Sequence, residues 1–149
     1  MLIQTSRFGR TEIDEARIMS FSEGLPGFPK HRRFVLLQPA PDPVFFWMQC
    51  VDDPELAFVV CDPRTFVPDY RVPIRKDEIA ALALADPGDC HVLVIVNKVD
   101  GELTANLLGP IVVGAHSWRA RQVVLSDKQY GIRYRLLSPC SRQPVAQTA

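Results

Sequence analysis

The sequence lacks long hydrophobic runs and a recognisable secretory leader. Its apolar runs, such as residues 92–96, are far too short to cross a bilayer as a helix. The opening residues, MLIQTSRFGR, show no basic start followed by an apolar stretch and a small-residue cleavage site. The sequence therefore predicts a cytoplasmic protein that makes no contact with membranes.

An excess of positive charge is also missing. The 149 residues include 17 lysines and arginines and 17 aspartates and glutamates, so the formal net charge is zero. A protein that binds nucleic acid through its phosphates normally carries a clear basic excess. We therefore expect no direct contact with nucleic acid.

The common signatures of catalysis and cofactor binding are absent. The sequence has no GxGxxG, Walker, GxSxG or HExxH motif, and His31, His91 and His116 are far apart in the chain. Cys90 is adjacent to His91, but neighbouring side chains of a strand point to opposite faces of the sheet, which argues against a thiolate with its base. We predict no enzyme activity, no cofactor and no metal site.

Cysteines are few and show no pairing pattern. The four of them form no CxxC pair, and their spacing fits no zinc site. In a reducing compartment such cysteines are free thiols. We expect Cys50, Cys61 and Cys90 in the core and Cys140 in a C-terminal tail.

Short apolar segments separated by turn residues make up most of the chain. The 13 prolines and 8 glycines divide it into pieces rich in valine, isoleucine, leucine, phenylalanine and tyrosine. This pattern predicts a mostly β protein: a single compact β-barrel-like domain of short antiparallel strands, residues 1–137, followed by a flexible tail, residues 138–149. The expected strands cover residues 2–8, 17–21, 33–38, 44–51, 56–61, 91–99, 102–108, 111–115, 122–125 and 132–137.

One short helix is predicted at residues 77–85. Asp77 and Glu78 place negative charge in its first turn, where the helix dipole favours it. Ile79 and Leu82 belong to its apolar stripe, and the Asp-Pro-Gly sequence of residues 86–88 ends it.

The clearest predicted element is a hairpin around Asp100 and Gly101. A two-residue Asp-Gly turn fixes the register of its strands, so that Val99 lies opposite Glu102. The face that we assign to the core carries Val94, Val96, Ala105 and Leu107.

Two charged segments have more than one interpretation. Residues 30–33, Lys-His-Arg-Arg, either contact phosphate or form a solvated face, and the second is the commoner outcome on a neutral protein. Asp52, Asp53 and Glu55 surround a proline turn, which is either a landing place for a basic partner or a plain solvated turn.

Five sequence blocks, in order, resemble the FliW family of flagellar assembly factors. The first is Ile-Met-Ser-Phe followed by Glu-Gly-Leu-Pro-Gly-Phe. The resemblance covers roughly residues 18–137, and the blocks that carry it are residues 18–28, 56–63, 66–70, 104–111 and 121–125 with Tyr130.

The resemblance implies a regulator rather than a catalyst. Members of this family bind flagellin in the cytoplasm and also bind the RNA-binding translational repressor CsrA. Bound to CsrA, they prevent it from silencing flagellin messenger RNA. We expect this chain to do the same as a monomer, without contacting RNA itself.

The Gly-Leu-Pro-Gly-Phe loop supplies three candidate partner-binding residues, Leu25, Pro26 and Phe28. Its glycines allow backbone angles that other residues resist, and its proline stiffens the loop. The loop is either a partner-facing apolar surface or a tight connection that packs Leu25 and Phe28 into the end of the barrel.

Three further candidates are Asp69, Tyr70 and Asn106. Tyrosine often buries its ring at an interface while its hydroxyl stays in water, but Tyr70 could equally be a core residue with Asp69 in a turn. Asn106 either contacts a partner or hydrogen-bonds the backbone before Pro110.

Two rival functions use the same fold. One is a small β-barrel enzyme with an unrecognised site, and the other is a β-barrel that binds a small ligand. A ligand-sized apolar cavity would support the ligand-binding barrel, and a filled interior would argue against it. Because the tail adds little apolar surface, we also expect its deletion from Ser138 onward to leave thermal stability largely unchanged.

Overall fold

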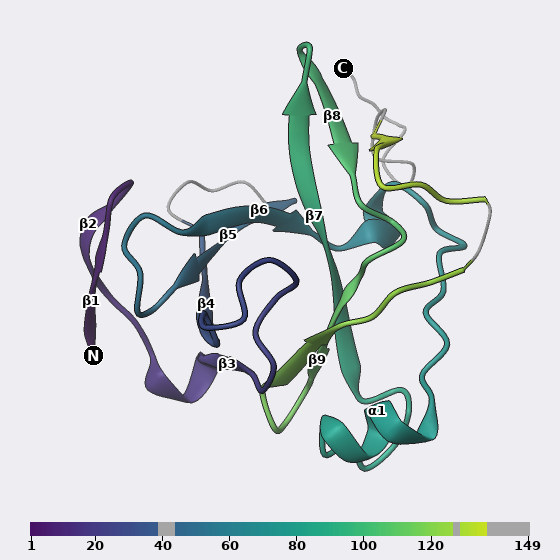
Figure 1. Cartoon of the computed structure of the whole chain (residues 1–149), viewed down its shortest axis with the longest axis horizontal. Helices are drawn as coiled ribbons and strands as arrows, with labels where there is room; N and C mark the ends of the chain where they lie inside the picture. The colour runs from purple at the N-terminus through teal and green to yellow at the C-terminus, as the bar shows by residue number, and fades with distance from the viewer. Residues whose placement is uncertain (39–43, 127–128, 137–149) are drawn as a thin grey trace.

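Short strands form most of the computed structural model, which describes residues 1–38, 44–126 and 129–136 (Figure 1). The proline-rich loop expected at residues 39–43 and the tail expected at residues 138–149 lie outside the described residues. The elements are β1 (Leu2–Thr5), β2 (Gly9–Glu12), the 3-10 helix η1 (Glu15–Arg17), β3 (Met19–Phe21), β4 (Arg33–Leu37), β5 (Phe45–Cys50), β6 (Ala57–Cys61), the 3-10 helix η2 (Pro63–Thr65), α1 (Lys76–Ala81), β7 (Cys90–Val99), β8 (Glu102–Ala105), β9 (Ile111–Gly114), β10 (Arg119–Gln122) and β11 (Tyr134–Arg135).

Nine of these strands form one strongly curved sheet. Its order is β11-β8-β7-β6-β5-β4-β3-β10-β9, and β9 also pairs with β7. That last pairing curls the sheet back on itself, so the predicted barrel is confirmed in a partial form, with β8 and β11 outside the ring. The pairings of the described strands are antiparallel as expected, except that β10 runs parallel to β3.

The ring is possible because β7 is ten residues long and has different neighbours along its length. Its first residues, from Cys90 to Leu93, pair with β9, and its last residues pair with β8. The upper part of the β7–β8 hairpin therefore projects beyond the ring (Figure 1). The structure confirms its register, including the Val99–Glu102 pair.

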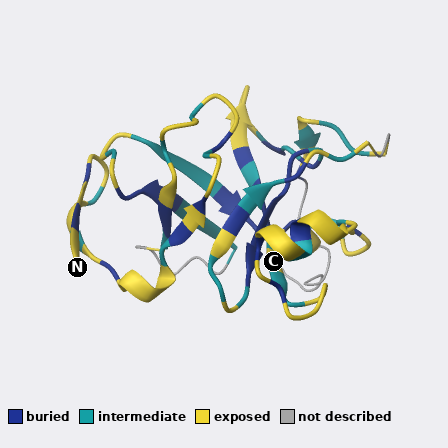
Figure 2. Cartoon of the chain, turned by 60° about the horizontal axis from the view of Figure 1, so that its bottom comes forward, coloured by how far each residue is buried: buried dark blue, intermediate teal, exposed yellow. Residues whose placement is uncertain are grey.

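The interior of the ring is filled with side chains. Met19, Phe34 and Met48 are fully buried, and Phe21 and Leu25 add to the same cluster. Figure 2 shows this as buried strand segments at the centre, surrounded by exposed loops. The core therefore lies inside the curved sheet, as the alternating apolar pattern requires.

A second cluster packs on the other face of β7. The four residues assigned to the core of the hairpin, Val94, Val96, Ala105 and Leu107, are buried here together with Tyr70. Leu93 points into the ring instead, and Ile95 packs against the same ring cluster. The middle of β7, from Leu93 to Val96, thus packs against apolar side chains on both faces, which explains its continuous apolar sequence.

The helix α1 ends earlier than expected, at Ala81 rather than at residue 85. Ala83 has a positive φ of 52°, and the Leu84 amide donates to the Ile79 carbonyl at 2.9 Å. This left-handed turn closes the helix and buries both Leu82 and Leu84. Tertiary burial of two leucines therefore ends the helix before the Asp-Pro-Gly sequence is reached.

Two of the strands predicted from the sequence need correction. The strand expected at residues 2–8 ends at Thr5 and pairs as β1 with β2, the polar segment Gly9–Glu12, which carries no apolar pattern. The strand expected at residues 122–125 lies at Arg119–Gln122, since its pairing with β9 brings Ala120 into the core and leaves Val124 exposed.

Candidate functional site

The 22–29 loop, residues 22–29 after β3, is a tight reversal of the chain. Gly24 and Gly27 have positive φ values of 69° and 87°. The Phe28 amide donates to the Leu25 carbonyl at 2.7 Å, and the Leu25 amide donates to the Phe28 carbonyl at 3.3 Å. The loop is therefore a small hydrogen-bonded unit in which residues 25 and 28 face each other.

The apolar side chains of this loop have different environments. Leu25 is buried in the ring cluster, Pro26 is exposed at the tip, and Phe28 is half-buried. The Phe28 ring packs edge-on against Phe58, with centroids 5.7 Å apart, and against His31 at 5.8 Å. One side chain therefore anchors the loop in the core and two remain accessible, and a partner contact of these two stays a prediction.

Asn106 organises the turn that follows β8. Its Oδ1 accepts hydrogen bonds from the amides of Leu108 at 3.2 Å and Gly109 at 3.0 Å. The carbonyl of Gly109 in turn accepts from Gln122 Nε2 at 2.8 Å. The expected bond from Asn106 to the backbone before Pro110 therefore exists, and its half-buried side chain still borders the surface.

Replacing Asn106 with alanine is expected to lower the free energy of unfolding by about 1–2 kcal/mol. The change removes the acceptor of two partly buried amides, and each unsatisfied amide loses its hydrogen bond. Chemical denaturation measures the loss. Asn97→Ala on the exposed part of β7 is the matched control and should change stability by less than about 0.5 kcal/mol. Equal effects of both substitutions would contradict the assigned role of Asn106.

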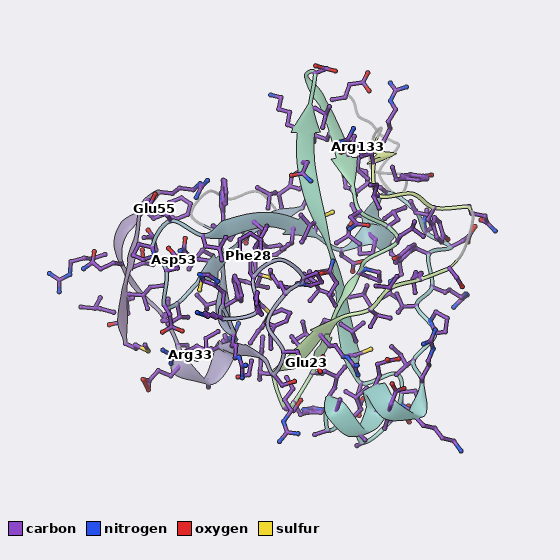
Figure 3. All side chains as sticks on the ribbon, viewed as in Figure 1. Glu23, Phe28, Arg33, Asp53, Glu55 and Arg133 are labelled. Atoms are coloured by element: carbon purple, nitrogen blue, oxygen red, sulfur yellow. The ribbon has the colours of Figure 1, made fainter. Side chains whose placement is uncertain are left out.

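The structure brings four of the six candidate residues to one surface hollow of about 360 Å³. We call it the apolar groove. Phe28 lies near the middle of the face shown in Figure 3, with Arg133 toward the top. The lining residues are Leu25, Pro26, Phe28, Phe58, Ile95, Asn97, Asn106, Gln122, Ile132 and Arg133.

Asp69 and Tyr70 do not line this groove. Tyr70 is only 3% exposed, and its hydroxyl donates to the Leu107 carbonyl at 2.6 Å. Its ring contacts Tyr130, with centroids 4.9 Å apart, while Asp69 is exposed beside it. This environment favours the interpretation of Tyr70 as a core residue, and a partner contact of Asp69 stays a prediction.

The basic run and the acidic turn pair with each other. His31 Nε2 lies 3.0 Å from Asp53 Oδ2, and the Arg33 guanidinium forms an ion pair with Asp52. The hydrogen bond from Arg33 holds the pKa of the Asp52 carboxyl below its usual value. These two pairs connect the residues that follow the 22–29 loop to the turn between β5 and β6.

The buried thiols are poorly suited to nucleophilic chemistry. Burial raises the pKa of Cys61 to about 12 and also raises the pKa of Cys50 and Cys90. A thiol must ionise to attack or to bind a metal. In the part of the chain that the structure describes, no group of three or more His, Cys, Asp or Glu residues could hold a metal ion.

Sequence reasoning missed three apolar residues of the groove: Phe58, Ile95 and Ile132. Ile132 is 62% exposed, one of the most exposed large apolar side chains among the described residues. Phe58 and Ile95 lie within strand patterns that look like ordinary core. Only the pairing of β5, β6 and β7 shows that their side chains reach the groove, so no local signal could have identified them.

No helix among the described residues is long and apolar enough to cross a membrane.

Comparison with known proteins gives one consistent family. The model of the FliW protein family matches residues 2–136. A flagellar assembly factor FliW of Bdellovibrio bacteriovorus is 36% identical over all of this chain and 86% of its own length, and one of Magnetococcus marinus is 34% identical over all of this chain and 93% of its own length. A crystal structure of the flagellar assembly factor FliW superimposes with a TM-score of 0.83 at 32% identity, covering 94% of this chain and 99% of the other.

Proposed function

The chain belongs to the FliW family of flagellar assembly factors, and we propose that it acts in the cytoplasm by binding flagellin and the translational repressor CsrA. Binding to CsrA relieves the repression of flagellin messenger RNA, and flagellin competes for the protein as it accumulates. The chain acts as a monomeric binding protein, without catalysis and without contacting RNA itself.

The apolar groove is the observation that supports this proposal. It combines accessible aromatic and aliphatic side chains, Phe28 and Ile132, with polar lining groups such as Asn97 and Arg133. Interfaces between proteins typically have such an apolar centre and a polar rim. A zero net charge also suits a protein that binds an RNA-binding protein rather than RNA.

The filled interior argues against the ligand-binding barrel. Met19, Phe34, Met48 and Val60 occupy the inside of the ring and are fully buried. A small-ligand site needs an accessible cavity lined by apolar groups. The groove on the outer surface therefore remains the better candidate for recognition.

Calorimetric titration of the purified protein with CsrA, and separately with flagellin from the same cell, tests the proposal. We expect saturable one-site binding to each, with one partner lowering the apparent affinity for the other. Failure of the folded protein to bind either partner would overturn the proposed function.

Ile132→Glu is expected to weaken binding of at least one partner about tenfold or more. The substitution places a charge in the apolar groove, where burying it against a partner without a counter-charge is unfavourable. Val124→Glu is the matched control, because Val124 is 74% exposed and does not line the groove. Both variants should keep the stability of the parent protein. Equal binding by both variants would exclude the groove as a binding surface.

A further inference from the structure

Three hollows adjoin along β10 and the 22–29 loop. The first is lined by residues 119–121 of β10, the second by residues 120–122, and the third, the apolar groove, by Gln122. The 22–29 loop follows the same order, from Ser22 in the first hollow to Phe28 in the third. The three hollows therefore form a row on one face, and in Figure 3 the labelled Arg133, Phe28 and Glu23 follow one another from the top toward the bottom of the view.

The end of the row opposite the apolar groove is rich in arginine, and we call it the arginine pocket. Its volume is about 430 Å³. Among the described residues, Glu23 is the one carboxylate in its lining. The guanidinium groups come from β4, from the residue before it and from β10: Arg32, Arg33, Arg119 and Arg121.

Two of these arginines lack a carboxylate partner among the described residues. Arg33 is paired with Asp52, and Arg121 lies 3.9 Å from Glu78. Among the described residues, the Arg32 side chain has no ion pair and donates one hydrogen bond, to the Pro29 carbonyl at 3.4 Å, and the exposed Arg119 side chain also has no ion pair. The pocket therefore presents two uncompensated guanidinium groups, which favour carboxylates as hydrogen-bonding partners.

The hollow between the two ends has four small residues among the ten that line it. Gly24 and Gly27 carry no side chain, and Ser22 and Ala120 carry small ones. At Gly27 a Cβ would meet no atom within 4 Å, so a polypeptide backbone has room to pass close to the loop there. The row thus offers apolar contact at one end, space for a backbone in the middle and positive charge at the other end.

We propose that this row binds one extended segment of a partner protein, with apolar residues in the apolar groove and acidic residues in the arginine pocket. The inference rests on the proposed function, since the groove is the same surface, and it adds the chemistry and direction of the bound segment. Acidic residues at one end would orient the segment and speed its association, because charge complementarity acts mainly on register and on rate.

The C-terminal residues of this chain are a poor occupant of the arginine pocket. Residues 137–149 contain no aspartate or glutamate and include Arg142. Nucleic acid phosphate is the other anionic alternative, and it would not use the apolar end of the row. A partner segment that is both apolar and acidic matches both ends.

Fluorescence anisotropy with two labelled peptides tests the inference. Both peptides carry leucine and phenylalanine in one half, and the other half carries glutamate in the first peptide and glutamine in the second. The glutamate peptide should bind about tenfold more tightly than the glutamine peptide at low salt, and the difference should shrink as salt screens the charges. Equal affinity of the two peptides would overturn the inference.

Charge-reversed variants locate the effect. The double variant R32E/R119E should remove the preference for the glutamate peptide, whereas R10E/R71E, which changes the net charge equally at exposed sites outside the row, should retain it. A labelled single-stranded RNA that loses binding in R32E/R119E would assign the pocket to phosphate and overturn the inference.

Titration of the same variants with full-length CsrA and flagellin separates this inference from the proposed function. If R32E/R119E binds CsrA and flagellin like the parent protein, the proposed function stands and the inference about the row is overturned. If the parent protein prefers the glutamate peptide but binds neither partner, the inference about the row stands and the proposed function is overturned.

Discussion

Gly24→Ala is expected to lower the free energy of unfolding by about 3 kcal/mol. At a φ of 69° the left-handed conformation of an alanine lowers the free energy of unfolding by roughly 1–2 kcal/mol. A Cβ at this position would also lie 2.5 Å from the Phe28 carbonyl oxygen and 2.8 Å from backbone atoms of Pro29. Backbone atoms cannot rotate away as a flexible side chain can, so the loop must shift, at a cost of about 1–3 kcal/mol.

Gly27→Ala is the matched control for this prediction. Its φ of 87° is equally unfavourable for alanine, but a Cβ there meets no atom within 4 Å. We expect it to cost only the conformational part, roughly 1–2 kcal/mol. Urea denaturation of both variants measures the difference. If both cost the same, the close approach of Gly24 to residues 28 and 29 does not constrain the loop.

The same substitution also tests how the loop shapes the site. A shift of the loop at Gly24 displaces Leu25 and Phe28, which line the apolar groove. Calorimetric titration of Gly24→Ala should therefore show weaker partner binding at a temperature where the variant is still folded, whereas Gly27→Ala should bind like the parent protein.

Local signals predicted those parts of the fold that depend on neighbouring residues. The Asp100-Gly101 turn fixes the β7–β8 register because only two residues separate the strands, and the observed pairs agree with it. The glycines of the 22–29 loop likewise indicated a tight turn, and both have positive φ.

Pairing between distant segments could not be predicted in the same way. The partial ring depends on β9 pairing with β7 and on β3 pairing in parallel with β10. The second of these pairings joins Ser20 to Arg119, at nearly opposite ends of the described chain. No local pattern distinguishes such a pairing from a simple antiparallel meander. The hairpin face assigned to the core is buried, but against Tyr70 and β11 rather than inside the ring.

In the candidate site, too, some residues were predicted from the local sequence and others come together only through the fold. Leu25, Pro26 and Phe28 were identified from one local motif, while Asn106 reaches the same groove only because β8 and the loop are brought together by the sheet. Arg119 and Ile132 carry no distinguishing sequence signal. Their positions beside the 22–29 loop depend on the β3–β10 pairing and on the segment that leads into β11.

Tyr70→Ala is expected to cost about 3–5 kcal/mol, because it empties a buried aromatic site. Tyr70→Phe keeps the ring and removes only the hydroxyl that donates to the Leu107 carbonyl at 2.6 Å. Its expected cost is about 1–2 kcal/mol. The two variants together separate ring packing from the hydrogen bond, and chemical denaturation at neutral pH measures both. A loss below about 0.5 kcal/mol for Tyr70→Ala would contradict its assignment to the core.

The free energy of unfolding measured as a function of pH in the alkaline range gives an independent test of the environment of Tyr70. Burial, with a smaller effect of Tyr130, raises the pKa of Tyr70 above its ordinary value in the folded protein. The folded state therefore keeps the proton at a pH where the unfolded chain releases it, and the stabilisation is complete only below about pH 10. Above that pH the parent protein should lose up to about 1.4 kcal/mol per pH unit more than Tyr70→Phe. The buried thiols ionise in the same range in both proteins, so their contribution cancels in the difference. Parallel curves for the two proteins would mean that the hydroxyl is in contact with water, as an interface tyrosine would be before its partner binds.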